Sequence, residues 1–188
     1  MLQTRSSTEA WSQVRVEFTK ALALALLLWG VAEPVDAWDE PSGFRDIPWG
    51  SPPAVAKEKL PDLSCAGRCS GHLTIGQVRV FTMIEFETGG GMDAVSLSFP
   101  SSNFYEIKVA FVERYGEPTA RRTSIVQNRM GAKFQNEILE WQGQKIFIKL
   151  EQYGSKLTDS WATIQTIEGR RARLERYREK LQEGKKDL

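Results

Sequence analysis

The feature that most constrains the fold is a pair of alternating apolar and polar segments joined by glycines. The apolar side chains of residues 78–86 share one parity: Val78, Val80, Ile84 and Phe86. After three glycines at 89–91, residues 95–99 repeat the alternation. Period two is typical of half-buried strands, and a short glycine-rich turn joins antiparallel neighbours. We therefore predict a β-hairpin. Phe81 and Met83 interrupt its polar face, which indicates either partial cover of that face or a bend in the strand.

A second hairpin is predicted further along the chain. Residues 138–141 and 145–150 are apolar segments on either side of Gln142-Gly143-Gln144, which has the composition of a tight turn. Residues 122–128 are a weaker strand candidate, and residues 158–167 contain the last one. Short connections of this kind imply antiparallel pairing.

One helix is predicted before each hairpin. Residues 52–60 begin with a proline that suits the first helical position. In residues 103–115 the aromatic and aliphatic side chains recur at helical spacing, and Asn103 with Glu106 fits a capping box. Gly116-Glu117-Pro118 ends this second helix, because glycine adopts the left-handed cap and proline cannot continue a helix.

The predicted fold class is α+β. It comprises an antiparallel sheet of about five to six strands, one main helix packed on the sheet, and a charged C-terminal helix. The order of helix followed by strands occurs twice, in 52–99 and 102–167, although sequence identity between these halves is too low to indicate a repeat. We expect residues 38–167 to form a single domain and residues 168–188 to form a charged helical tail.

Composition excludes several classes of function. The 188 residues carry 25 basic and 24 acidic side chains, one histidine and two cysteines. A net charge of +1 gives no electrostatic case for nucleic-acid binding. Two cysteines are too few for a four-thiolate zinc site. A hydrolytic triad would have to use His72, because the chain has no other histidine. The chain has no G-x-S-x-G sequence, and its glycine run lacks the residues of a phosphate-binding loop. We expect no cofactor and no catalysis.

The N-terminal segment has the pattern of a secretory signal. Residues 21–32 form an uncharged apolar run of 12 directly after Lys20, and Ala37 is a small residue at a suitable cleavage point. Spanning a bilayer takes about 20 apolar residues, so this run favours a cleaved signal over a retained anchor, which is the alternative. We predict a signal peptide over residues 1–37, a periplasmic or secreted location, and no membrane span after cleavage.

Several short motifs resemble small exported bacterial proteins of uncharacterised function. Residues 44–50, Phe-Arg-Asp-Ile-Pro-Trp-Gly, match the F-x-x-I-P-W-G start of their mature domain. The other matching pieces are Ile84-Glu85-Phe86, Val95–Phe99, Tyr115-Gly116-Glu117-Pro118 and Trp141. The match spans most of 44–151. The layout is more loosely similar to beta-lactamase-inhibitor-like envelope modules, which bind other proteins. The resemblance implies an envelope location and transfers no catalytic residue; the cysteines and the charged tail fall outside it.

Cys65 and Cys69 form the sharpest local motif. A pair of cysteines in an exported chain typically forms a disulfide, and Gly67 between them eases the turn that this requires. His72 follows three residues later, so Cys65, Cys69 and His72 are an alternative set of metal ligands. Free thiols with a redox role are a further alternative. The disulfide is the interpretation we favour, with no metal bound.

The C-terminal segment is strongly basic. From Glu168 to the end it carries eight basic and five acidic residues. Its basic side chains suit anionic lipid headgroups or an acidic partner. The alternative is a solvated helix supported by Arg171–Glu175 and Arg176–Glu179 pairs, which the interleaved acids favour.

Together these features predict a non-catalytic binding module of the bacterial cell envelope, whose partner is another envelope protein. The candidate binding residues on the first hairpin are Arg79, Phe81 and Met83, and those on the tail are Arg171 and Tyr177. Two alternatives stay open. One is a small metal- or thiol-dependent protein that uses the cysteines and histidine, and the other is a purely structural envelope protein.

Overall fold

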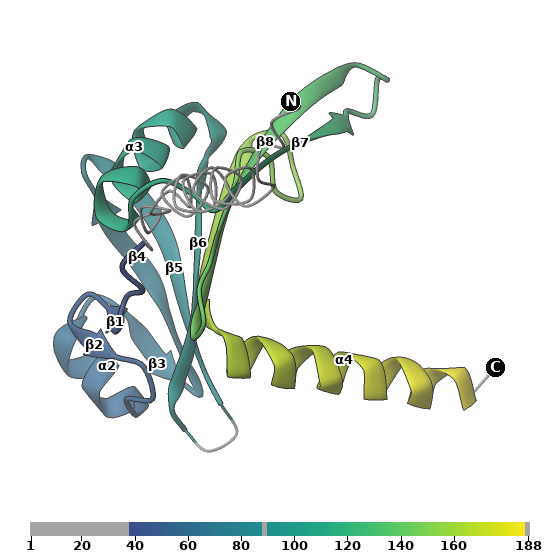
Figure 1. The fold of residues 1–188 in the computed structure, drawn as a ribbon. Helices are drawn as coiled ribbons and strands as arrows, with labels where there is room; N and C mark the ends of the chain where they lie inside the picture. Colours follow the sequence, from purple (N-terminus) through teal and green to yellow (C-terminus); the bar gives the residue numbers. More distant parts are fainter. Residues whose placement is uncertain (1–37, 88–89, 187–188) are drawn as a thin grey trace, which may run out of the picture. The chain divides into compact units, whose positions relative to one another are not determined.

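The computed structural model describes residues 38–87 and 90–186. The predicted signal segment, residues 1–37, lies outside the described residues. From Trp38 onward the chain has an α+β fold, as the sequence predicts (Figure 1). Its helices are α2 (Pro53–Lys59), α3 (Phe104–Tyr115) and α4 (Ile167–Lys186). Its strands are β1 (Gly43–Phe44), β2 (Ile47–Pro48), β3 (Ser64–Ala66), β4 (Arg68–Ile75), β5 (Val78–Phe86), β6 (Met92–Pro100), β7 (Ala120–Gln127), β8 (Lys133–Gln142), β9 (Ile146–Glu151) and β10 (Asp159–Thr166).

The main sheet is antiparallel and has eight strands in the order β3-β4-β5-β6-β10-β9-β8-β7. β1 and β2 form a separate small hairpin. A helix followed by four strands therefore occurs twice, as α2 with β3–β6 and as α3 with β7–β10. The two halves meet where β6 pairs with β10, at the centre of the sheet. This brings the last strand of each half side by side.

The strand count exceeds the predicted five to six because β3 and β4 were not expected. Their sequence, Ser64–Ile75, is rich in glycine, serine and cysteine, and its first apolar side chain in regular alternation is Leu73. Such a composition is typical of a loop. The structure pairs β4 with β5 along seven positions, so the ladder with an already ordered strand overrides a weak local preference.

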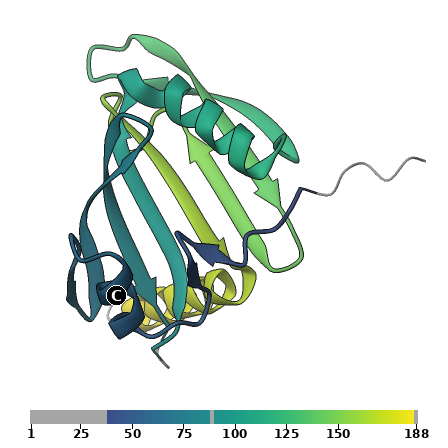
Figure 2. The same cartoon turned by 90° about the vertical axis from the view of Figure 1, so that its left-hand side faces the viewer.

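One face of the sheet is covered by helices. α2 and α3 both lie on this covered face, at opposite ends of the strands (Figure 2). α3 buries Phe104, Ile107 and Phe111 against the sheet. Beside it, the buried Trp141 donates a hydrogen bond from Nε1 to the carbonyl oxygen of Gly116, 2.8 Å away. The aromatic side chains thus join the end of α3 to β8.

The predicted capping box at the start of α3 is wrong. A 3₁₀ turn, Ser101–Asn103, precedes the helix, and Asn103 makes no side-chain cap hydrogen bond. Glu106 instead accepts a hydrogen bond from the backbone N–H of Gln77, at 3.2 Å. Its carboxylate therefore ties α3 to the β4–β5 turn rather than to its own first turn. The predicted stop is confirmed, because α3 ends at Tyr115 with Gly116 as its C-cap. The left-handed cap is wrong, since Gly116 combines a φ of +76° with a ψ of −171°, an extended conformation that glycine alone adopts readily.

The first described residues are tied to the β8–β9 turn. The carboxylate of Glu40 accepts hydrogen bonds from the backbone N–H groups of Gln144, Lys145 and Ile146, at 2.7–2.8 Å. Desolvation raises the pKa of Glu40, but these donors and the Lys145 charge outweigh it, so the pKa lies below its ordinary value of 4.5. A Cβ at Gly143 would lie 2.2 Å from the Glu40 carboxyl carbon, so the turn has no room for a side chain there.

α4 follows β10 directly and projects from the face opposite α2 and α3 (Figure 1). Its first turn is held against β6: a Cβ at Gly169 would lie 2.3 Å from the carboxylate of buried Asp93. Arg173 forms an ion pair with Asp93, lies 3.6 Å from Glu85 and donates a hydrogen bond to Gln165 at 2.9 Å. From Leu174 onward its described side chains are exposed.

Within the described residues, no helix is both long and apolar enough to cross a membrane.

Candidate binding face

The face of the sheet opposite α2 and α3 carries exposed apolar side chains. On β5, Arg79, Phe81 and Met83 alternate with the buried Val80 and Thr82 and therefore point away from the helices. We call this side of the sheet the open face. Phe81 is 41% exposed, and Met83 is partly buried. Both side chains are thus partly covered, and the ring centroid of His72 lies 5.5 Å from that of Phe81. The strand is irregular further on, between Glu85 and Phe86.

The open face gains a second aromatic side chain from the other half of the chain. Phe81 pairs with Ser98 on β6, and Ser98 pairs with Trp161 on β10. Trp161 is 39% exposed, and its Nε1 donates a hydrogen bond to Thr163 at 3.2 Å. Two exposed aromatic side chains therefore flank one serine across three adjacent strands. The sequence predicts a strand over 158–167 that contains Trp161, but it does not predict which surface this side chain joins.

Small side chains separate these aromatic residues. On β6 the residues of the open face are Ala94, Ser96 and Ser98, which lie between the larger side chains of β5 and β10. Ala94 and Ser96 are themselves buried, so Ser98, between the two aromatic side chains, is the partly exposed member of this row. Aromatic and methionine side chains are enriched at the centres of protein interfaces. The open face thus has the composition of a protein-binding surface.

The cysteine and histidine motif is divided between two faces of β4. Cys65 and Cys69 are disulfide-bonded, as the sequence predicts, and Gly67 in the intervening turn has a φ of +78°. Cys69 is fully buried on the covered face, whereas His72 lies on the open face with its ring centroid 5.5 Å from that of Phe81. The structure does not bring the three candidate metal ligands together. No potential metal cluster of His, Cys, Asp and Glu occurs among the described residues.

The candidate residues of the tail lie on α4, which projects from the open face. Arg171 and Tyr177 are both exposed, Tyr177 to 61%. Arg79 lies near the end of the sheet where β10 begins, and α4 continues from the end where β10 finishes. Arg79 and Arg171 therefore share a side of the molecule but not a common contact.

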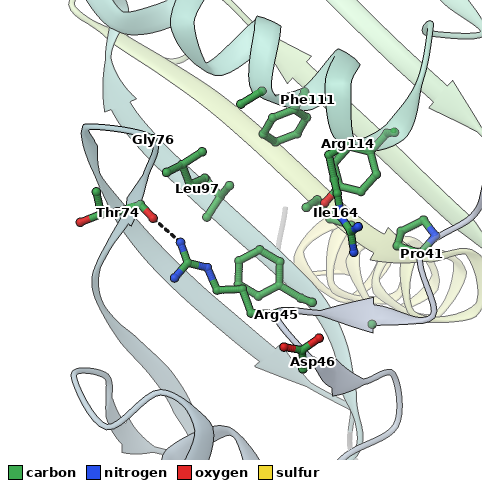
Figure 3. Close-up of a pocket in the computed structure, with 14 residues that line it drawn as sticks. Pro41, Arg45, Asp46, Thr74, Gly76, Leu97, Phe111, Arg114 and Ile164 are labelled. Carbon is green, nitrogen blue, oxygen red and sulfur yellow. Dashed lines mark hydrogen bonds between the residues drawn. The ribbon is translucent and has the colours of Figure 1, made fainter.

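A cavity of about 420 Å³ on the covered face was not predicted (Figure 3). The β1–β2 hairpin forms one wall, and α3 forms another, with Arg114 and Tyr115. At the hairpin tip Arg45 and Asp46 have positive φ angles of 47° and 61°, and Arg45 donates a hydrogen bond to the carbonyl of Thr74. Burial raises the pKa of Tyr115, and the charge of Arg114 opposes that effect. Two guanidinium groups beside a cavity suit a small anion.

The floor of this cavity limits what it can hold. Leu97, Ile164 and Phe111 form it, and each is at most 3% exposed. An apolar ligand would gain little contact with side chains that are already buried by their neighbours. The sequence signal for the cavity is the Phe44–Ile47 segment, where two apolar residues flank Arg45 and Asp46.

Comparisons with protein-family models, with curated proteins and with solved structures each found no match. The fold is α+β, with one sheet face covered by α2 and α3 and an opposite, open face on which only the base of α4 packs among the described residues.

Proposed function

We propose that this protein is an exported, non-catalytic binding module of the cell envelope that recognises another protein through its open face. The observation that carries the proposal is the pair Phe81 and Trp161, which are 41% and 39% exposed and lie on either side of Ser98. Burying large aromatic side chains is a main source of affinity in protein complexes. Met83 and His72 extend the same surface.

Export rests on the N-terminal sequence and on the disulfide. Residues 21–32 and Ala37 fit a cleavable signal, and a bonded cysteine pair suits an oxidising compartment. If export is correct, protein isolated from its native host has the mass of residues 38–188 less about 2 Da for the disulfide. A full-length mass would favour the anchored alternative.

The two alternatives receive less support. A thiol or metal function needs free cysteine side chains near His72, but the sulfurs are bonded to each other and His72 lies on the opposite face of β4. A purely structural role needs no aromatic side chains exposed to water on the open face. It predicts that no partner contacts Phe81 or Trp161.

Photo-crosslinking in the native host tests the proposal. Benzoylphenylalanine is placed at position 81 or 161, and in a control at position 105. Tyr105 is an aromatic residue on α3 that is 62% exposed, so it is more accessible than the test positions and lies on a different surface. We expect one discrete crosslinked protein from positions 81 and 161 and none from position 105. Equal products from all three positions, or none from positions 81 and 161, would contradict the proposal.

The captured protein then allows a measurement of affinity. The double variant Phe81→Ala/Trp161→Ala removes both aromatic side chains, whereas Tyr105→Ala removes one from α3. We expect the double variant to weaken binding about tenfold or more, because buried aromatic anchors dominate interface energy. Tyr105→Ala should bind as the unmodified protein does. An unchanged affinity of the double variant would contradict recognition through the open face.

A further inference from the structure

Three parts of the molecule remain outside the proposed function: the cavity beside Arg45, the buried Asp93 at the base of α4, and the exposed part of α4. The cavity has a floor that is already buried. Asp93 is neutralised by Arg173. The exposed part of α4 carries charged and apolar side chains that do not pack against the rest of the described chain. It supports a separate inference.

The side chains of α4 are segregated by type around the helix. All its acidic residues recur at intervals of seven and four, which places them on one side: Glu168, Glu175, Glu179 and Glu183. Leu174, Tyr177 and Leu181 recur at intervals of three and four on another side, and they are 48%, 61% and 49% exposed. We call these three residues the apolar stripe. Arg171 and Arg178 flank Leu174 at i−3 and i+4, so one edge of the stripe is basic.

The apolar stripe begins beside two hollows between α4 and the sheet. One hollow, of about 300 Å³, is lined by Leu174, Arg171 and Arg178 together with Gln142 of β8. The other, of about 550 Å³, extends over the open face of β7–β9. Gln142 and Arg170 line both, so the two hollows adjoin. We call them together the corner groove.

The corner groove is electropositive. The basic residues that line it are Arg122, Arg170, Arg171 and Arg178, against Glu140 and Glu175. Glu140 is already paired with Arg122 at 2.8 Å. The guanidinium of Arg170 lies 4.0 Å from the ring centroid of Phe147, which holds this charge at the corner.

The ion pairs that would neutralise this surface do not form. The sequence suggested Arg171–Glu175 and Arg176–Glu179 pairs, but neither is among the ion pairs of the described residues. Arg170, Arg171 and Arg178 likewise have no carboxylate of the described chain within 4.0 Å. Their donors are free to bind an external anionic group.

We propose that the corner groove binds an acidic segment of a protein partner, with carboxylates on Arg170, Arg171 and Arg178 and an apolar side chain on Leu174. The inference rests on the proposed function and names the chemistry of the partner. Charge complementarity selects this occupant. A second copy would bring the same excess of positive charge, and the two helices would repel each other.

The shape of the site separates a protein from a membrane. α4 projects from the open face, so the groove is an inside corner between a helix and a sheet (Figure 1). A flat bilayer that contacts the far end of α4 would not reach the corner at Phe147. The apolar stripe also has only three side chains, which is little area for insertion between headgroups. A protruding protein segment can contact both walls.

Peptide binding to the full chain tests this inference. The probe is a fluorescein-labelled peptide of 12 residues that alternates glutamate and leucine, and its control carries lysine in place of glutamate. Vesicles that contain anionic phosphatidylglycerol form a separate arm. We expect the acidic peptide to bind, with an affinity that falls as salt rises, because exposed charges are screened. Equal binding of the lysine peptide, or binding of vesicles without binding of the acidic peptide, would overturn the inference.

A matched pair of variants locates the binding. Arg171→Gln/Arg178→Gln removes two charges from the groove. Arg176→Gln/Lys180→Gln removes two exposed charges from the same helix that do not line it. Circular dichroism checks that both keep α4 helical. We expect about threefold to tenfold weaker peptide binding for the groove variant and less than about twofold for the control. Equal losses of peptide affinity in the two variants would overturn the inference. The crosslinks at positions 81 and 161 test the proposed function separately, because neither position lines the corner groove.

Discussion

α3 and α4 are both amphipathic, yet only one of them is part of the core. α3 has 12 residues and buries Phe104, Ile107 and Phe111 to 3% exposure or less. α4 has 20 residues, and among residues 167–185 only Gly169 is buried. Helices in proteins are stabilised mainly by packing an apolar face. Both helices have apolar residues at the helical period of 3.6 residues. In α3 these residues pack in the core, whereas in α4 they stay exposed and available for binding.

The largest expected effect follows from removing the packing of α3. Phe111→Ala deletes a side chain that is 3% exposed and contacts Tyr115 and Trp141. We expect the free energy of unfolding to fall by about 3–5 kcal/mol, from lost burial and the cavity that remains. Val109→Ala on the same helix is the control, because Val109 is 55% exposed. A loss at position 109 as large as at position 111 in urea unfolding would contradict this assignment of the buried face.

The second-largest loss in the free energy of unfolding is expected where the base of α4 packs against β6. Gly169→Ala places a Cβ against the Asp93 carboxylate, so the base of α4 must move, and we expect a loss of about 1–3 kcal/mol. Gly184→Ala is the control on the same helix, since a Cβ there meets nothing within 4 Å. It should stabilise the helix by up to about 1 kcal/mol. Urea unfolding that gave the two variants the same sign would contradict a close approach at Gly169.

A smaller effect depends on pH. The folded pKa of Glu40 lies below its unfolded value, so its contribution to stability is complete above the unfolded pKa and is lost as pH falls through the folded pKa. We expect Glu40→Gln to cost less than about 1 kcal/mol at pH 7 and to flatten the loss of stability below pH 4.5. Asp39→Asn, at an exposed neighbour, is the control. Thermal unfolding from pH 7 to pH 3 measures the difference, and identical profiles for Glu40→Gln and the unmodified protein would contradict it.

The smallest effect is expected on the apolar stripe. Leu174→Ala/Leu181→Ala removes two side chains that are about half exposed and contribute little burial. The free energy of unfolding should change by less than about 0.5 kcal/mol per residue, as for other surface substitutions. A loss comparable to that of Phe111→Ala would mean that α4 packs against another part of the chain.

Much of the fold was predictable because it follows from local periodicity. The alternation in β5 and the spacing in α3 identified the correct buried faces. β3 and β4 were missed because their strand conformation comes from pairing with β5 and not from their own composition. The role of Glu106 was also missed, since its backbone partner at Gln77 lies on another element and competes with the local cap.

The candidate site was predictable only in part. The parity of residues 78–86 alone placed Phe81 and Met83 on the face opposite Val80, because side chains alternate along any strand. Whether that face is covered, and what lies next to it, depends on contacts between distant segments. The pairing of β6 with β10 brings Trp161 to the other side of Ser98 from Phe81, although 80 positions separate the two aromatic residues in the chain. Periodicity determines which way a side chain points, and only the strand order determines its neighbours.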